Sequence, residues 1–212
     1  MAVTGLTLIG RSSSSFTRVA RIFAAELGVA YDFEILRDLQ TLDAASYGGN
    51  PALKIPSLRT PTATWFGAQN VCRELERMAG QRMRVVWSEA FEQPVLANAH
   101  ELVMHAMSTN VNLIMSGMGG AEAQGAHRTK MDQSLRNTLA WLDAHVGAVL
   151  AVLPPERDLS FLEVGMYCLV THLEFRQVLP TSPYSALVGF AQSFGARSSC
   201  QATPFRFDTP PS

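Results

Sequence analysis

Residues 50–58 read Asn50-Pro51-Ala52-Leu53-Lys54-Ile55-Pro56-Ser57-Leu58. The Ile55-Pro56 pair begins a short apolar strand, and the first residue of a strand is one of the few places in a sheet where proline is tolerated. The next apolar run, residues 63–66, follows across a short polar connection and predicts a β-hairpin. A helix over about 68–78 comes next, because its apolar residues recur on one face. These residues therefore predict a β-β-α unit.

The segment before this hairpin predicts a strand, a helix and a second strand. Leu6 to Ile9 is a short apolar run closed by Gly10, as expected of a buried strand. Apolar spacings of three and four then indicate a helix that ends at Gly28, and period-two alternation over residues 30–36 indicates a second strand. A strand that returns through a crossover helix runs parallel to the first. Residues 1–79 thus form β-α-β followed by β-β-α.

The second half of the chain has a helical pattern. No convincing strand is predicted from Val85 onward, and four long apolar patterns of helical period follow. They cover about 86–117, 123–150, 161–177 and 184–195. The polar, basic residues 80–84 lack this periodicity, and the predicted linker covers 80–86. Ser160, with Glu163 three positions later, predicts a capping box at the start of the third helix. An all-helical domain is therefore expected over 87–212.

Composition narrows the class of protein. With 212 residues, 47% apolar and 17% charged, the chain can bury a sizeable core. Its net charge of −1 gives no general attraction to nucleic acid or to an anionic membrane. No secretory signal and no run of roughly 18 apolar residues is present, so we expect a cytoplasmic protein without a membrane span. Three widely spaced cysteines indicate reduced thiols.

The order of these elements resembles the cytosolic glutathione transferases, which have an α/β thioredoxin-like N-terminal domain followed by an all-α C-terminal domain. The resemblance covers nearly the whole chain. In that family the proline corresponding to Pro56 has a cis peptide bond, and the residue corresponding to Ile55 offers its backbone N–H and C=O to the cysteinyl part of glutathione. The run Arg11-Ser12-Ser13 is similar to the start of the zeta-class signature. The run Ser14-Ser15-Phe16 is similar to the Ser-Pro-Phe run of tau-like classes. The resemblance also implies a homodimer.

The serine cluster, residues 12–15, suits the chemistry of glutathione conjugation. The reaction needs the thiol, whose unperturbed pKa is about 8.5, as a thiolate. At the start of the first helix, backbone N–H groups and the helix dipole favour an anion, and a serine hydroxyl can donate to the sulfur. On the resemblance, Ser14 takes the tau-like catalytic position and Ser12 the zeta-like one, with Ser13 a further candidate. At least one serine caps the helix. Arg11 and Arg18 form either a solvated basic flank or a partner for a substrate carboxylate.

The two ends of glutathione need their own partners. Lys54 could pair with the glycyl carboxylate, and it could equally protect an exposed strand edge. Most glutathione-binding members of the family hold the γ-glutamyl end with an acidic or amide residue followed by serine or threonine. This pair stands at the start of the helix that corresponds to residues 68–78 here. This chain has Gly67 and Ala68 there. Backbone N–H groups at the helix start, or the side chains of Gln69 or Asn70, are the available substitutes.

The acceptor substrate is expected along the helix near residues 100–116. Met104, His105 and Ser108 combine soft apolar and polar groups on this helix, although a methionine-rich stripe is also typical of a helix core. His100 and His105 are spaced i, i+5, whereas metalloprotease ligands on one helical face are spaced i, i+4. No metal site is predicted.

The sequence therefore predicts a glutathione transferase that conjugates glutathione to a small hydrophobic electrophile through a serine-stabilised thiolate, in a detoxifying role. The alternative is a noncatalytic binding or dimerisation module that keeps the fold but has lost tight glutathione binding, as Gly67-Ala68 would allow. The zeta-like Arg11-Ser12-Ser13 also leaves open an isomerase or dehalogenase with glutathione as cofactor. No cysteine lies in the loop after the first strand, which argues against disulfide exchange.

Overall fold

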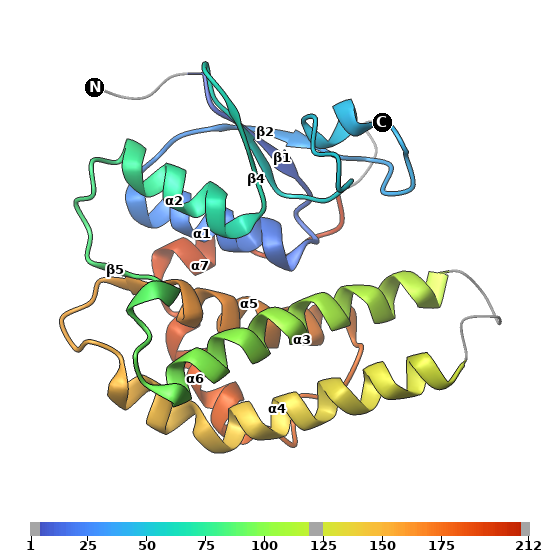
Figure 1. Ribbon diagram of the computed structural model, residues 1–212, viewed down its shortest axis with the longest axis vertical. Helices are drawn as coiled ribbons and strands as arrows, with labels where there is room; N and C mark the ends of the chain where they lie inside the picture. Colours follow the sequence, from blue (N-terminus) through green and yellow to red (C-terminus); the bar gives the residue numbers. More distant parts are fainter. Residues whose placement is uncertain (1–4, 119–124, 209–212) are drawn as a thin grey trace. The chain divides into compact units, whose positions relative to one another are not determined.

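The structure is a computed structural model that describes residues 5–118 and 125–208. The described residues group into two units by their backbone contacts (Figure 1). The first unit is Met1–Arg84 with Ala196–Ser212, and the second is Val85–Gly195.

The first unit contains a four-stranded mixed sheet in the order β2-β1-β3-β4. Its strands are β1 (Thr7–Gly10), β2 (Asp32–Ile35), β3 (Ser57–Arg59) and β4 (Thr64–Phe66). β1 and β2 run parallel, and β3 runs antiparallel to both of its neighbours. This confirms the predicted crossover and the predicted hairpin. The third strand begins just after Pro56 rather than at Ile55, because proline has no N–H to give to the ladder.

The helices of the first unit are α1 (Ser15–Leu27), the short η1 (Ala44–Tyr47), α2 (Ala68–Met78) and α7 (Ser198–Ala202). The two longer helices were predicted from the sequence, whereas η1 and α7 were not. α1 contacts both α2 and α7. The middle of its apolar face is fully buried, with Val19, Ile22 and Phe23 at most 1% exposed. Gly28 ends the helix in the left-handed conformation, with φ of 66°, and its N–H reaches the Ala24 and Ala25 carbonyls. The predicted bounds of α2 are confirmed.

The last segment of the chain returns to the first unit and is tied to α1. Glu26 accepts hydrogen bonds from Nε and Nη2 of Arg197, at 2.7 and 3.1 Å, and another from the Ser199 hydroxyl. Burial raises the pKa of Glu26, but these hydrogen bonds and the Arg197 charge together bring the pKa below its ordinary value of 4.5. The boundaries proposed from the sequence, 80–86 for the linker and 87–212 for the helical domain, do not include this return.

Glu26→Gln is expected to lower the free energy of unfolding by about 2 kcal/mol near neutral pH, because it leaves the Arg197 guanidinium without its carboxylate. A carboxylate with a depressed folded-state pKa stabilises the protein above its unfolded-state pKa, and this contribution is lost as the pH falls through the folded-state value. Thermal unfolding at a series of pH values tests this. Below pH 4.5 the Tm should fall less steeply with decreasing pH in the variant than in wild type.

The control for Glu26→Gln is Glu34→Gln. Glu34 pairs with Arg59 at 3.3 Å, but both side chains are nearly half exposed. Removing such a surface pair is expected to change stability by less than about 1 kcal/mol. Two results would show that the link between α1 and Arg197 does not stabilise the unit. One is an equal loss of stability in both variants, and the other is a Tm of Glu26→Gln that depends on acid pH as the wild-type Tm does.

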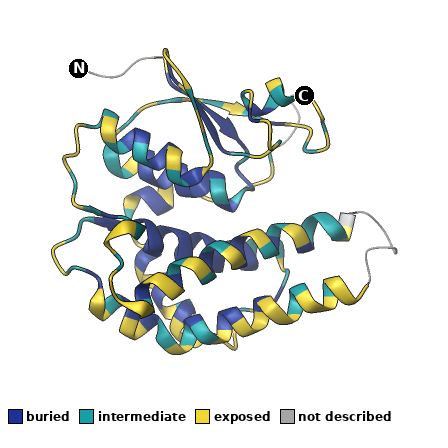
Figure 2. Cartoon of the chain, viewed as in Figure 1, coloured by how far each residue is buried: buried dark blue, intermediate teal, exposed yellow. Residues whose placement is uncertain are grey.

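The second unit is built mainly from four helices. Its elements are β5 (Val85–Val86), η2 (Ser88–Ala90), α3 (Pro94–Met118), α4 (Ala126–Val152), β6 (Leu159–Ser160), α5 (Phe161–Arg176) and α6 (Ser185–Gly195). α3 packs against α4 and α5, and α6 also packs against α4 and α5. Figure 2 shows α5 almost entirely buried, with 12 of its residues, from Phe161 to Leu173, in the buried class. This helix is the core of the unit.

Two short strands in the second unit correct the sequence prediction. Val85 pairs with Leu159 and Val86 with Ser160, in parallel, although no strand was expected from Val85 onward. Two residues are too few to produce the period-two pattern by which strands are recognised. This pairing keeps residues 85–86 out of the helix predicted from position 86. The helix begins instead at Pro94, where a missing N–H removes no helical hydrogen bond.

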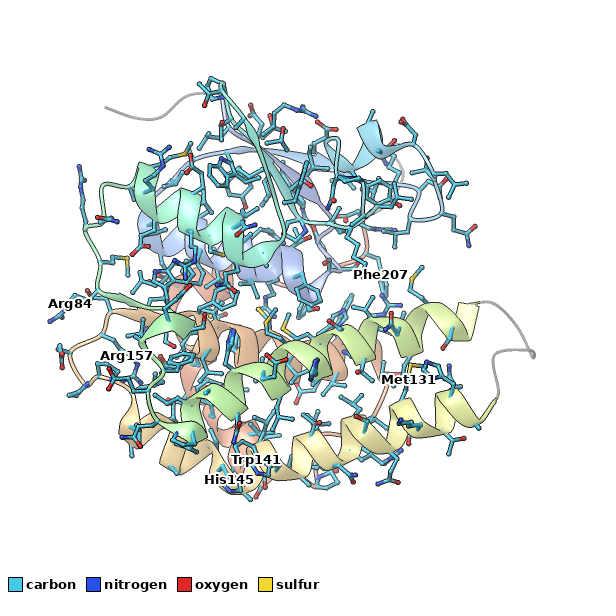
Figure 3. All side chains as sticks on the ribbon, viewed as in Figure 1. Arg84, Met131, Trp141, His145, Arg157 and Phe207 are labelled. Carbon is cyan, nitrogen blue, oxygen red and sulfur yellow. The ribbon has the colours of Figure 1, made fainter. Side chains whose placement is uncertain are left out.

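The capping box predicted at Ser160 and Glu163 is wrong in its hydrogen bonds. Ser160 is the N-cap residue of α5, but among the described residues its buried hydroxyl has no partner. The Glu163 carboxylate accepts instead from Nε and Nη2 of Arg157, both at 2.7 Å (Arg157 is labelled in Figure 3). A bidentate pair between charged groups is stronger than the bond from a backbone amide, so Arg157 holds Glu163 away from the Ser160 amide.

Two properties of the whole chain were also predicted from composition. All three cysteines are buried and none forms a disulfide, which confirms the prediction of reduced thiols. In the described ranges, no helix combines the length and the apolar character that crossing a membrane requires.

Candidate functional site

Three segments of the first unit meet at one edge of its sheet. The antiparallel registers pair Ile9 with Ser57 and Ser57 with Phe66. At this end of the strands, three segments therefore lie side by side: the residues after Ile9, the residues before Ser57 and the residues after Phe66. The Gly67 N–H donates to the Pro56 carbonyl at 3.0 Å, as this arrangement requires. The serine cluster, the Ile55-Pro56 pair and the start of α2 are thus neighbours, although the sequence separates them.

The serine cluster joins β1 to α1, and Ser14 is the residue that starts the helix. Its backbone is extended, with φ of −95° and ψ of 127°, and its Oγ accepts the Thr17 N–H at 3.2 Å. The Ser14 carbonyl accepts the Arg18 N–H at 2.9 Å. The cap therefore falls on the serine that the tau-like resemblance assigns to catalysis. A hydroxyl that accepts one bond keeps its hydrogen for a second, so the two roles are compatible.

The other serines of the cluster are buried. Ser12, Ser13 and Ser15 are 0, 7 and 1% exposed, and Ser14 is half-buried. The hydroxyls of Ser12, Ser15 and Thr17 have no hydrogen-bond partner in the part of the chain that the structure describes. Leaving a buried hydroxyl unpaired costs about 1–3 kcal/mol, and such groups nearly always have partners in native proteins. Because these three hydroxyl oxygens are buried, Ser14, the half-buried member of the cluster, is the serine most open to a ligand.

The Ile55-Pro56 pair lies opposite the serine cluster. Its peptide bond is cis, which confirms what the resemblance implies. Across the described residues, the main chain of Ile55 makes no hydrogen bond, so its N–H and C=O can bind an extended ligand. The preceding Lys54 side chain is exposed. The Lys54 carbonyl is held by the Asn50 amide, which donates to it at 2.8 Å.

The start of α2 carries no capping side chain. Gly67 has a φ of 82°, in the region that favours glycine, and Ala68 is 5% exposed. The Asn70 amide turns back and donates to the Phe66 carbonyl at 3.1 Å. The Asn70 side chain is therefore already engaged, and the backbone N–H groups of the first turn are the candidates for the γ-glutamyl carboxylate.

The residues predicted to contact the acceptor substrate lie on α3 of the second unit. Met104 is half-buried, while His105 and Ser108 are exposed. Nε2 of His105 lies 3.3 Å from a carboxylate oxygen of Glu101. Met107, in the same stretch, is 1% exposed and belongs to the core. Some residues of this stretch of α3 therefore belong to the core and others lie at the surface. No group of three or more metal-ligating side chains occurs among the described residues.

Two contacts of the C-terminal segment, one with the serine cluster and one with Arg18 beside it, were not predicted from the sequence. The Ser12 N–H donates to Oδ2 of Asp208 at 2.8 Å, across 196 residues. Arg18 is 5% exposed, donates to the Cys200 carbonyl at 3.3 Å and lies 4.4 Å from the centre of the Phe205 ring. The interpretation of Arg18 as a solvated residue is therefore wrong. No local pattern signals either contact, because each depends on the return of the C-terminal segment.

Comparison with solved structures identifies the fold. A glutathione S-transferase from Methylobacillus flagellatus KT, with glutathione bound, superposes with a TM-score of 0.76 at 19% identity, over 94% of this chain and 99% of that chain. A glutathione S-transferase from Methylobacterium radiotolerans JCM 2831, in complex with glutathione sulfonate, gives 0.73 at 16% identity, over 98% of both chains.

A glutathione transferase family member from Pseudomonas fluorescens Pf-5, with bound glutathione, gives a TM-score of 0.70 at 20% identity, over 94% of this chain and 98% of that chain. No family model matches the sequence, and no curated protein does. At these identities the likeness shows the fold alone. The predicted fold, a thioredoxin-like N-terminal part and a helical C-terminal part, is confirmed.

Proposed function

We propose that this chain, whose fold is that of the glutathione S-transferases, binds glutathione and transfers it to a small hydrophobic electrophile. One observation carries the proposal: the hydroxyl-rich start of α1, the open main chain of Ile55 and the start of α2 meet at one sheet edge. The bound glutathione and glutathione sulfonate of two similar structures support the choice of ligand.

Ser14 is proposed to stabilise the sulfur as a thiolate. Its hydroxyl donates to the sulfur, and the positive end of the α1 dipole favours the anion. Both effects lower the thiol pKa from about 8.5 and raise the fraction of nucleophile near neutral pH. The thiolate then attacks an electrophilic carbon and forms a C–S bond, while the leaving group departs with its bonding electrons. The thiol proton passes to solvent, and the serine is not consumed.

The rest of the ligand is assigned to the neighbouring segments. The main chain of Ile55 pairs with the cysteinyl part, and the Lys54 ammonium with the glycyl carboxylate. The γ-glutamyl carboxylate meets the backbone N–H groups at the start of α2. The acceptor substrate is assigned to Met104, His105 and Ser108 of α3. The homodimer, the cytoplasmic setting and the detoxifying role belong to the same proposal, and sedimentation analysis tests the first of them.

Thermal unfolding with and without glutathione tests the proposal. A ligand at 100 times its Kd stabilises the native state by about 2.7 kcal/mol, which raises the Tm of a chain of this size by about 5–10 °C. Free cysteine at the same concentration serves as the control for the thiol alone and is expected to leave the Tm unchanged. An unchanged Tm at about 10 mM glutathione would contradict the proposed function.

The noncatalytic alternative is favoured by one observation, the absence of a polar side chain at both Gly67 and Ala68. It predicts that glutathione binds weakly or not at all and that an activated aryl chloride is not conjugated. Binding together with turnover supports the enzyme, and the absence of both supports the module.

Ala68→Ser is expected to lower the Kd for glutathione about fivefold. The new hydroxyl stands at the first residue of α2 and can donate to the γ-glutamyl carboxylate, a bond worth about 1 kcal/mol. Isothermal titration calorimetry measures the change. Ala30→Ser, at an exposed position, is the control and should leave the Kd unchanged. If Ala68→Ser also leaves it unchanged, the γ-glutamyl end does not lie at the start of α2.

A further inference from the structure

Side-chain contacts tie the C-terminal segment after α7 to α7 itself and to α1. The Thr203 hydroxyl donates to the Ser199 carbonyl at 2.8 Å, inside the buried part of the unit. The Phe205 ring and the Arg18 guanidinium lie 4.4 Å apart in a cation–π contact. Such a contact is stronger when the cation is desolvated, and Arg18 is only 5% exposed. Phe207, labelled in Figure 3, is 63% exposed. The segment 203–208 is thus anchored before it reaches the serine cluster.

Asp208 ends this described segment with a buried carboxylate. Its side chain is 3% exposed, and its Oδ2 accepts the Ser12 N–H at 2.8 Å. Its other oxygen, Oδ1, lies 3.9 Å from Nε of Arg206, whose side chain is 65% exposed. A buried carboxylate is stable only where hydrogen bonds or charges compensate it. The Ser12 amide therefore has a charged acceptor from within the chain.

This contact lies in the loop that the proposed reaction needs. The backbone N–H groups before α1 and the dipole of the helix stabilise a negative sulfur. A second negative group in the same loop disfavours that charge, because like charges close together and away from water raise each other's energy. The docked Asp208 and a glutathione thiolate are therefore competing anions.

We propose that Asp208 is a residue of this site, an internal anion that occupies the Ser12 amide and must leave, or weaken its contact, before glutathione binds as a thiolate. The inference rests on the proposed function. In the protein without glutathione, segment 203–208 is docked on the serine cluster. In the form that is competent to bind glutathione, the segment is released. The apparent Kd for glutathione then equals the intrinsic Kd divided by the fraction of released chains.

Asp208→Asn in the full chain tests the proposal. The amide keeps the size of the side chain but removes its charge, so the contact with Ser12 weakens. We expect the Kd for glutathione, measured by titration calorimetry, to fall about tenfold. Asp32→Asn is the matched control, because it removes one negative charge from an exposed position of the same unit. It should leave the Kd unchanged.

The outcomes separate this inference from the proposed function. If wild type binds glutathione and Asp208→Asn binds it equally or more weakly, Asp208 does not compete and the inference is wrong, while the function stands. If neither chain binds glutathione, the proposed function is wrong and the inference falls with it. Hydrogen exchange of wild type gives a second measurement that needs no variant. Residues 203–208 should exchange faster with glutathione present, and unchanged or slower exchange overturns the inference.

Discussion

Ser14→Ala is expected to lower kcat/KM for the conjugation of glutathione to an activated aryl chloride by about 10- to 100-fold. The alanine removes the hydroxyl that donates to the sulfur, and a hydrogen bond to a charged group is worth about 1.5–3 kcal/mol. The same substitution removes the acceptor of the Thr17 N–H, so the protein is also expected to lose about 1 kcal/mol of stability. Steady-state kinetics and thermal unfolding measure the two effects.

Ser14→Asp separates catalysis from capping. Aspartate caps helices as well as serine does, but its ionised carboxylate has no hydrogen to donate. The variant should therefore keep its Tm and still lose activity. Ser12→Ala and Ser13→Ala are the comparisons within the cluster, and both keep the cap at Ser14. Loss of activity in Ser12→Ala with full activity in Ser14→Ala would move the catalytic role to the zeta-like serine. Full activity in all three alanine variants would contradict the proposed stabilisation of the thiolate by a serine of this cluster.

Gly10→Ala is expected to destabilise the protein by about 1–3 kcal/mol, or about 3–10 °C in Tm. A Cβ at Gly10 would stand 2.4 Å from Cγ2 and 2.6 Å from Oγ1 of Thr17. Thr17 is 0% exposed and β-branched, so its side chain has little freedom to move away. Because the Ser14 hydroxyl caps the Thr17 amide, a shift of Thr17 should also disturb the serine cluster and raise the Kd for glutathione.

Gly147→Ala is the matched control for Gly10→Ala. Gly147 is exposed within α4, and a Cβ there would have no atom within 4 Å. The substitution is expected to be neutral or to stabilise the helix by up to about 1 kcal/mol. If Gly10→Ala has the Tm and glutathione affinity of wild type, the close packing of β1 against the first turn of α1 does not position the cluster.

Local patterns were sufficient for the four strands of the sheet and for α1 and α2. The period of the apolar residues placed α2, Gly28 marked the end of α1, and the crossover made β1 and β2 parallel. Each of these features depends on residues within one or two turns, so propensity and pattern determine them. The cis bond before Pro56 came from the resemblance and not from the pattern itself.

Long-range contacts account for the features that the sequence did not reveal. Glu163 pairs with Arg157 instead of the Ser160 amide, because a charged partner outside the helix competes with the cap. Arg18 has the spacing of a surface residue but is buried under Phe205. Both cases depend on where another part of the chain lies, and no local rule contains that information.

The pKa of the thiol of bound glutathione tests the central claim most directly. The ultraviolet absorbance of the thiolate, followed as a function of pH on the saturated complex, gives this value for wild type and for Ser14→Ala. We predict a thiol pKa at least about one unit below the free value of about 8.5 in wild type, and a return toward that value in Ser14→Ala. A bound thiol that titrates near 8.5 in wild type would contradict the claim that the start of α1 stabilises the sulfur as an anion.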